Sequence, residues 1–186
     1  MTDIVRSMAA DIATLEVGTS ERIWRRLDRG ELVVARQSQP PGLRLDAVAA
    51  CTPERMWHLL GDFESLPAHI PALRTARVLR QRDGEAEVRF TMKLPFPVGQ
   101  LSWTNRIKTR QYGQSFGIAW ELVEGDLQAN SGRLLLAPYR GHPARTHARY
   151  QVQVETRSRL PRSAQRLATG WLLPKVIARL RDIAER

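Results

Sequence analysis

Apolar and polar side chains alternate along the middle of the chain. Between residues 86 and 155, five stretches carry an apolar residue at every second position, and the residues between them are mostly polar or charged. Successive side chains of a strand point to opposite faces, so this period of two predicts antiparallel strands with one buried and one solvent-facing side. Together with a strand expected over 74–80, this part of the chain is predicted to hold about six strands.

The period changes to that of a helix near the C-terminus. From Pro161 to Ile183, apolar residues recur on one helical stripe, while most of the basic residues lie elsewhere. Pro161 suits a first helical turn, whereas Pro174 lies within the pattern and is expected to kink or interrupt the helix. The pattern therefore predicts one long C-terminal helix.

Shorter elements precede the strands. Apolar residues at helical spacing predict helices over 3–15 and 20–28, with Ser20 as the N-cap of the second. Glu31–Arg36 is predicted to be a short strand. The prolines and the glycine of Gln37–Gly42 predict a break, which we interpret as a boundary before the main domain.

A strand and two short helices open this main domain. Leu43–Ala50 has the pattern of a strand, and Thr52 followed by Pro53 supplies the N-cap and the first residue of a helix. Ser65–Leu73 contains two prolines and therefore leaves room for only a helical turn or two.

This order of elements predicts an α+β fold. A one-sided antiparallel sheet and a single striped helix bury their apolar faces together when the sheet curves around the helix. Such an arrangement tends to leave an apolar gap between sheet and helix, and an apolar gap binds apolar ligands. The side chains expected to face this gap and bind a ligand are Phe90, Met92, Trp103, Asn105, Ile107, Ile118, Trp120, Leu134, Leu136, Tyr150, Val152, Leu172 and Val176.

The opening of the main domain resembles that of a known superfamily. LRLDAVAACTPERMWHLLGDFESLPAHIPAL (43–73) is similar to the start of START-like (SRPBCC) proteins, which include polyketide cyclase/dehydrase and coenzyme Q-binding proteins. WELVEGDLQANSGRLLLAPY (120–139), the long final helix and RGELVVARQ (29–37), similar to an added first strand of some members, extend the resemblance over roughly 30–186. It implies a helix-grip fold, in which a curved antiparallel sheet grips the C-terminal helix around a hydrophobic cavity. We therefore expect an N-terminal helical extension, residues 1–29, and a START-like helix-grip domain, residues 30–186.

The composition is that of a folded protein in a reducing compartment. Of the 186 residues, 42% are hydrophobic and 26% are charged, as in ordinary globular proteins. No apolar run approaches the ~20 residues of a membrane span, and no secretory signal is recognised. The single cysteine, Cys51, excludes an intramolecular disulfide and a multi-cysteine metal site. We therefore expect a cytoplasmic protein.

The net charge of +10 is concentrated towards the C-terminus. Residues 145–186 carry ten Lys or Arg against three acidic residues, a net charge of +7. Such a segment is either a solvated surface or a site for anionic lipid or nucleic acid. We favour the solvated surface, with peripheral contact to an anionic membrane second. Nucleic acid comes last, because the aromatic residues lie on the predicted buried face.

Two polar side chains are predicted to face the apolar gap. Asn105 interrupts an apolar alternation, so it either fixes a ligand's carbonyl or hydroxyl group or is a core residue satisfied by backbone or water. Tyr150 combines a large apolar surface with a hydroxyl group, and structural burial is favoured over a role as a catalytic acid.

No pattern singles out a catalytic residue, a metal site or a cofactor. His58 and His69 lie beside the two short helices, where the cavity mouth of the superfamily tends to lie, and surface or capping roles are favoured over acid–base catalysis. His142 and His147 are placed in or beside a loop. No histidine pair has ligand spacing supported by a third acid or thiol, and nucleotide-binding glycine motifs are absent.

Three functions fit these observations. The first is the binding and transport or chaperoning of a lipid, quinone or polyketide-like molecule, and it is favoured because the inward face has almost no ionisable group. The second is an aromatase/cyclase or dehydratase in which Asn105, Tyr150 or a histidine at the mouth polarises carbonyl groups. The third is an interaction with RNA or a ribonucleoprotein through the basic surface. The ligand and the oligomeric state are left open.

Overall fold

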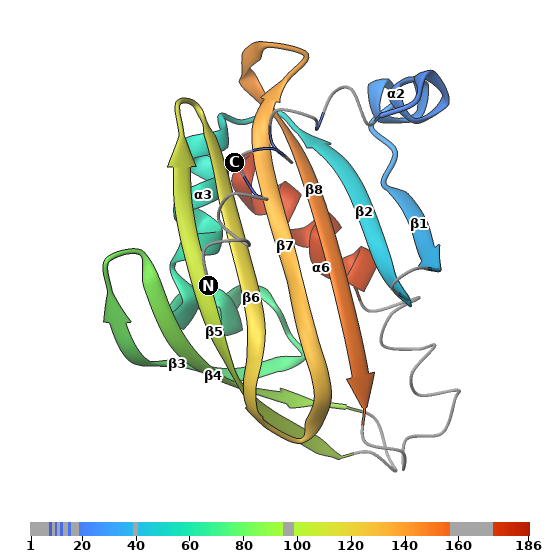
Figure 1. The fold of residues 1–186 in the computed structure, drawn as a ribbon. Coiled ribbons are helices and arrows are strands. Elements are labelled where there is room, and N and C mark those ends of the chain that lie inside the picture. Colours follow the sequence, from blue (N-terminus) through green and yellow to red (C-terminus); the bar gives the residue numbers. More distant parts are fainter. Residues whose placement is uncertain are drawn as a thin grey trace.

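Eight strands and a few short helices make up the described part of the chain (Figure 1). The computed structural model describes residues 8, 10, 12, 15, 19–38, 41–94, 99–156 and 173–186. In chain order the elements are α2 (Glu21–Asp28), β1 (Val33–Ser38), β2 (Pro41–Ala49), α3 (Pro53–Gly61), η1 (Phe63–Ser65), α4 (Leu66–His69), β3 (Leu73–Arg82), β4 (Glu85–Lys93), β5 (Gln100–Tyr112), β6 (Ser115–Gly125), β7 (Leu127–Tyr139), β8 (His142–Thr156) and α6 (Leu173–Ala184).

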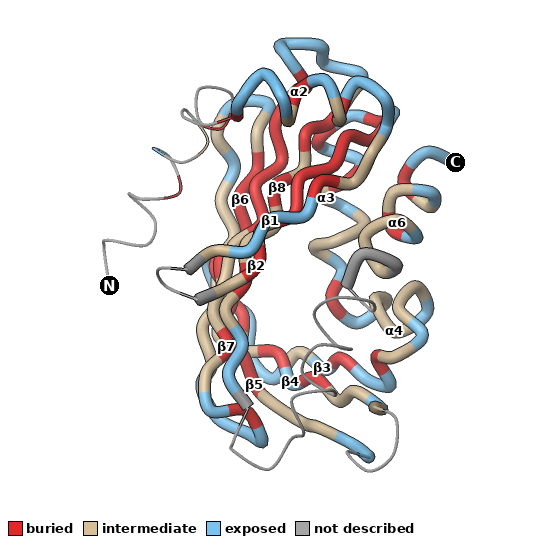
Figure 2. The backbone as a smooth tube through the Cα atoms, turned by 90° about the vertical axis from the view of Figure 1, so that its right-hand side faces the viewer, coloured by how far each residue is buried: buried red, intermediate tan, exposed pale blue. Residues whose placement is uncertain are grey.

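The strands form one antiparallel sheet in the order β1-β2-β8-β7-β6-β5-β4-β3. β1 and β3 are therefore the two edge strands. The sheet curves strongly, and α3, α4 and α6 lie on its concave side (Figure 2). This is the predicted α+β architecture, with the six strands expected between residues 74 and 155 present as β3 to β8.

The start of α3 follows from its local sequence. The Thr52 hydroxyl accepts a hydrogen bond from the backbone N–H of Arg55 at 3.2 Å, and Pro53 is the first helical residue, where its missing N–H is not needed. α2 also begins where predicted, after Ser20, although the Ser20 side chain makes no capping hydrogen bond.

The break predicted at Gln37–Gly42 joins two strands of one sheet, so its interpretation as a boundary before the main domain is wrong. β1 pairs with β2 from Val33 opposite Asp46 to Ser38 opposite Pro41. Proline and glycine serve tight turns as well as linkers, so composition alone does not separate the two. A side chain at Gly42 would also place its Cβ 2.8 Å from the Val152 carbonyl oxygen. The division of the chain at residue 29 stays a prediction.

Part of the outer, convex face of the sheet is covered by residues of the N-terminal segment, although this side of the strands was predicted to face solvent. Trp24 and Leu27 of α2 pack with Val33, Val48 and Tyr139. A neighbouring cluster joins Leu15 to Leu135 and Ala137. The prediction that one side of the strands faces solvent is therefore wrong for this part of β2, β7 and β8. The N-terminal segment supplies an apolar surface there, and the alternation within the strands does not reveal it.

α6 is anchored at its C-terminal end to the start of α3 and to the residue that follows β2. The Arg55 guanidinium donates to the Ala184 carbonyl at 2.7 Å, and the Glu185 carboxylate accepts the Ala50 N–H at 2.9 Å. Pro174 is the second residue of α6, and residues 161–172 of the predicted helix lie outside the described residues. Within the described ranges, no helix is long and apolar enough to cross a membrane.

Candidate functional site

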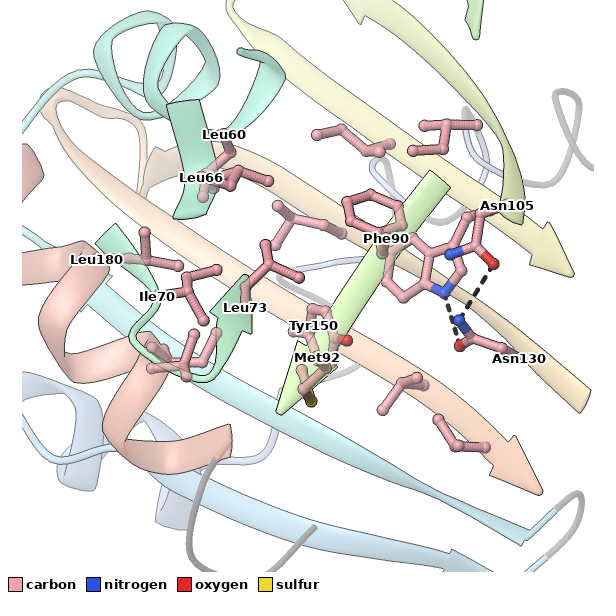
Figure 3. A pocket seen from close by; sticks show the side chains of 18 of the residues that line it. Leu60, Leu66, Ile70, Leu73, Phe90, Met92, Asn105, Asn130, Tyr150 and Leu180 are labelled. Atoms are coloured by element: carbon pink, nitrogen blue, oxygen red, sulfur yellow. Dashed lines mark hydrogen bonds between the residues drawn. The ribbon is translucent and has the colours of Figure 1, made fainter. Parts of the chain in front are cut away.

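A cavity of about 910 Å³ lies between the concave face of the sheet and the helices (Figure 3). Its wall is mostly apolar and receives residues from all eight strands, together with α3, η1, α4 and α6. A volume of this size is in the range of pockets that hold a small organic molecule.

The structure brings most of the predicted gap residues together at this cavity. Those that line it are Phe90, Met92, Trp103, Asn105, Ile107, Ile118, Trp120, Leu134, Tyr150, Val152 and Val176. Leu172 lies outside the described residues. Leu136 is fully buried elsewhere in the core, opposite Phe116 in the β6–β7 pair, and Trp57 of α3 stacks on Phe116 with ring centroids 5.1 Å apart. This end of the sheet is filled by the helix, so Leu136 faces packed side chains rather than the cavity.

The strand period did not identify the helical part of the wall. Met56, Leu60, Phe63, Leu66 and Ile70 close the cavity from α3, η1, α4 and the residue that follows α4. They belong to the segment 43–73, whose resemblance to START-like proteins predicts the fold but does not assign these residues to the cavity wall. Their apolar spacing across two short helices was the signal that could have assigned them to the wall.

Asn130 is the polar wall residue that the sequence reasoning missed. Its Oδ1 accepts a hydrogen bond from Trp120 Nε1 at 3.3 Å, and its Nδ2 donates to Asn105 Oδ1 at 3.2 Å (Figure 3). Asn130 has the same strand parity as Leu134, so extending that alternation towards the start of β7 would have placed it on the inner face. The Asn105 carbonyl oxygen is thus satisfied by the protein, and a role of Asn105 in ligand binding stays a prediction.

Two aromatic pairs form flat parts of the wall. Trp120 stacks on Tyr150 with centroids 5.3 Å apart and an interplanar angle of 29°, and Phe90 stacks on Trp103 at 5.7 Å and 28°. Burial raises the pKa of the Tyr150 hydroxyl above its usual value, so this group stays protonated at neutral pH. A protonated phenol can donate a hydrogen bond but is a weak acid, which agrees with a structural rather than an acid-catalytic role.

Few charges reach the cavity. The charged residues among those that line it are Arg36, Glu155 and Arg181. Arg36 and Glu155 are exposed, and Arg181 is half-buried with its guanidinium donating to the Gly30 carbonyl at 2.9 Å. The described part of the wall is therefore apolar, with amide, indole and phenol groups as its main polar features.

The histidines do not line the cavity. His58 is exposed on α3 and lies 3.9 Å from Glu54, and His69 is half-buried at the end of α4. His142 is exposed at the start of β8. The prediction that His147 lies in or beside a loop is wrong: it lies within β8, on the convex face, with none of its surface exposed.

His147 belongs to an ionic cluster on that convex face. At its centre is the Asp46 carboxylate, which is 1% exposed. One of its oxygens lies 2.9 Å from His147 Nε2 and also accepts a hydrogen bond from Arg149 at 2.7 Å. The other oxygen accepts a hydrogen bond from Arg44 at 2.6 Å. The Arg149 guanidinium also donates to the Thr19 hydroxyl, which ties the cluster to the N-terminal segment. Arg149 is therefore unavailable to an anionic partner, although it counted towards the basic C-terminal region.

The pKa values in this cluster follow from burial and hydrogen bonding. Burial alone would raise the pKa of Asp46, but the bonds from His147, Arg149 and Arg44 outweigh it and hold that pKa at about 2. Burial lowers the pKa of His147 despite the bond to Asp46. A neutral His147 that donates from Nε2 leaves Nδ1 as an acceptor, and that atom is buried with no partner within the described residues. The cluster is thus charged on Asp46 and the arginines and neutral on His147.

One protein family matches the sequence. Residues 50–181 match the family described as polyketide cyclase / dehydrase and lipid transport, which is more than half of the chain and includes most of the cavity wall. No curated protein matches.

Solved structures from bacteria and humans share the fold. The STAR-related lipid transfer protein from Xanthomonas axonopodis is 13% identical, covers 83% of this chain and 99% of its own, and has a TM-score of 0.67. The Zhui aromatase/cyclase from a Streptomyces species is 16% identical, with coverage of 78% and 93% and a TM-score of 0.64. Human StAR-related lipid transfer protein 5 is 11% identical, with coverage of 100% and 96% and a TM-score of 0.63. At these identities the similarity shows the fold alone.

Proposed function

Since the chain belongs to the polyketide cyclase / dehydrase and lipid transport family, we propose that it binds a hydrophobic small molecule in its internal cavity and transports or chaperones it. The observation that carries this proposal is the cavity of about 910 Å³ with an apolar wall. Burying an apolar ligand there removes its surface from water without placing a charge in a medium of low polarity.

The wall also favours binding over chemistry. Catalysis by proton transfer needs a positioned group whose pKa lies near the working pH. Burial moves the pKa of Tyr150 away from that range, and the histidines lie outside the cavity. The neighbouring aromatase/cyclase fold and the neutral donors of the wall support a cyclase or dehydratase acting on an apolar substrate as the second candidate.

Mass spectrometry under native conditions and a cavity-filling variant would test the proposal. Protein purified from its own host is expected to carry an apolar molecule that organic solvent extracts. In addition, Ala148→Phe places a ring in the cavity wall and should lower the affinity for the neutral dye Nile red by about tenfold, about 1.4 kcal/mol. Leu79→Phe on the exposed face of β3 is the matched control and should leave the affinity unchanged.

Other results would contradict the proposal or favour the second candidate. Protein that contains no apolar molecule and binds Nile red equally well with or without the ring at position 148 would contradict a ligand-binding cavity. Chemical conversion of the extracted molecule on incubation with fresh protein would instead favour the cyclase or dehydratase.

We further propose that ligand is collected at an anionic membrane surface. α6 supplies Val176, Ile177 and Leu180 to the cavity wall and also carries the exposed Arg179, so a basic group lies close to the cavity. Positive charge beside apolar surface suits a peripheral contact with anionic lipid. Sedimentation with vesicles should increase with their phosphatidylserine content and decrease with salt; sedimentation insensitive to both would contradict this contact.

A further inference from the structure

One unpartnered polar group of the cavity wall is the amide nitrogen of Asn105. Asn105 lines the cavity from β5. It uses its Oδ1 to accept from Asn130, and its Nδ2 has no partner in the described part of the chain. An amide NH₂ can only donate. A ligand atom that satisfies it must therefore be an acceptor.

Two consecutive hydrogen bonds, from Trp120 to Asn130 and from Asn130 to Asn105, set the orientation of the Asn105 amide. We call these three residues the relay. The indole nitrogen of Trp120 can only donate, so the atom of Asn130 that it contacts at 3.3 Å is the carbonyl oxygen Oδ1. The amide nitrogen of Asn130 is thereby directed to Asn105, whose Oδ1 it contacts at 3.2 Å. Asn105 is then left with its own amide nitrogen free (Figure 3).

The first member of the relay is held in place from two sides. Tyr150 stacks on the Trp120 ring at 5.3 Å. Opposite Trp120 in the β6–β7 pair stands Gly132, and a Cβ at that position would overlap the indole. The absence of a side chain at Gly132 therefore gives the indole the space to lie flat against β7, and its N–H is presented to Asn130 from a fixed position.

We propose that the Asn105 amide nitrogen is the donor of a binding site for one neutral oxygen acceptor, such as a ketone or ester carbonyl, on a planar apolar ligand. This deepens the proposed function and rests on it. The donor is uncharged, so it suits a carbonyl oxygen better than a carboxylate, whose lost hydration it would not replace. The stacked pairs Trp120–Tyr150 and Phe90–Trp103 give the adjoining wall flat faces for a ring system. Trp120 and Asn130 act as positioning residues, because they select which atom of the Asn105 amide is free.

Three probes with the same fused-ring skeleton test this site. Fluorenone carries a carbonyl at the bridging position, fluorene carries a methylene there, and carbazole carries an N–H donor. Dissociation constants measured by quenching of tryptophan fluorescence should show fluorenone binding about 3- to 10-fold tighter than fluorene, as one hydrogen bond allows. Carbazole should bind no tighter than fluorene.

Variants of the relay should change this preference in different directions. Asn130→Asp, measured at about pH 8 so that the carboxylate is ionised, only accepts hydrogen bonds, so Asn105 must turn its nitrogen towards it and present its oxygen to the ligand. The preference should then move from fluorenone to carbazole. Trp120→Phe keeps an aromatic wall but removes the indole N–H, and should reduce the preference for fluorenone about 3-fold or more.

A variant of the cavity wall outside the relay serves as the control, and certain results would overturn the acceptor site. Met92→Leu changes the cavity wall without touching the relay and should leave the ratio of affinities unchanged. Thermal unfolding of each variant establishes that it is folded. Equal affinity for fluorenone and fluorene, or an unchanged preference in a folded Asn130→Asp protein, would overturn the acceptor site and leave the proposed function intact. Failure of all three probes to bind would overturn the acceptor site, and failure of Nile red to bind as well would contradict the proposed function.

Discussion

Gly132 matters because of the space that it leaves for a neighbour. A Cβ there would overlap the Trp120 indole and the Gln151 carbonyl oxygen. Gly132→Ala is therefore expected to lower the free energy of unfolding in urea by about 1–3 kcal/mol, the usual cost of overpacking. Gly61→Ala is the control, since its nearest neighbour would lie 4.0 Å away at the end of α3, and it should be neutral or slightly stabilising. Equal stability of the two variants would contradict the assigned contact.

The buried ionic cluster predicts that stability falls on acidification. His147 binds a proton in the unfolded chain near pH 6.5 but resists it when folded, so its contribution is present above about pH 6.5 and is lost as pH falls towards the folded pKa. Asp46 also makes stability fall on acidification, but at lower pH. It contributes roughly 2 kcal/mol to the free energy of unfolding above its unfolded pKa of 3.8, and this contribution is lost as the pH falls to about 2.

Urea unfolding measured from about pH 7.5 to 5 would check the histidine part of this prediction. His147→Gln can still donate to Asp46 but does not titrate, so its stability should depend less on pH in this range. His58→Gln removes an exposed histidine and should leave the wild-type slope unchanged. Parallel pH profiles for wild type and His147→Gln would exclude His147 as the titrating group.

At the scale of elements, strands were easier to predict than what covers them. The alternation around Phe90, Trp103 and Ile118 placed β4, β5 and β6 correctly because each strand carries its own period. The same reasoning failed on the convex face, where Asp46, His147 and Arg149 have the polar character of a solvent-facing side yet are buried. Their burial depends on contacts with Thr19 and α2, which come from distant sequence and leave no local pattern.

α2 should contribute to the stability of the sheet rather than fold apart from it. Leu27 is fully buried against Val33, Val48 and Tyr139, so Leu27→Ala is expected to lower the free energy of unfolding of the whole protein by about 2–5 kcal/mol. Arg25→Ala removes an exposed ion pair with Glu21 and should change it by less than about 1 kcal/mol. Circular dichroism and tryptophan fluorescence would both follow the transition. A main transition unaffected by Leu27→Ala would support residues 1–29 as a separate extension.

At the scale of the whole molecule, the sequence supplied the architecture and most of the strand part of the cavity wall. Tyr150 and Trp120 could be placed because the apolar positions of strands in one sheet share its buried face. The Trp120–Asn130–Asn105 relay could not, because it depends on cross-strand register and on side-chain rotamers. Leu136 shows the same limit: parity gave its face correctly but not whether a helix or empty space lies above it.

The edge strand β3 suggests a second role for part of the positive charge. Among the described residues, no strand pairs with the outer side of β3, and an unpaired strand offers its backbone to any other chain that can add to it. Arg74, Arg77, Arg80 and Arg82 are all exposed along this strand. Two molecules meeting edge to edge would bring these arginines together, and the repulsion would oppose pairing before backbone hydrogen bonds could form. These four arginines are thus explained as protection against self-association, a role that needs no anionic partner.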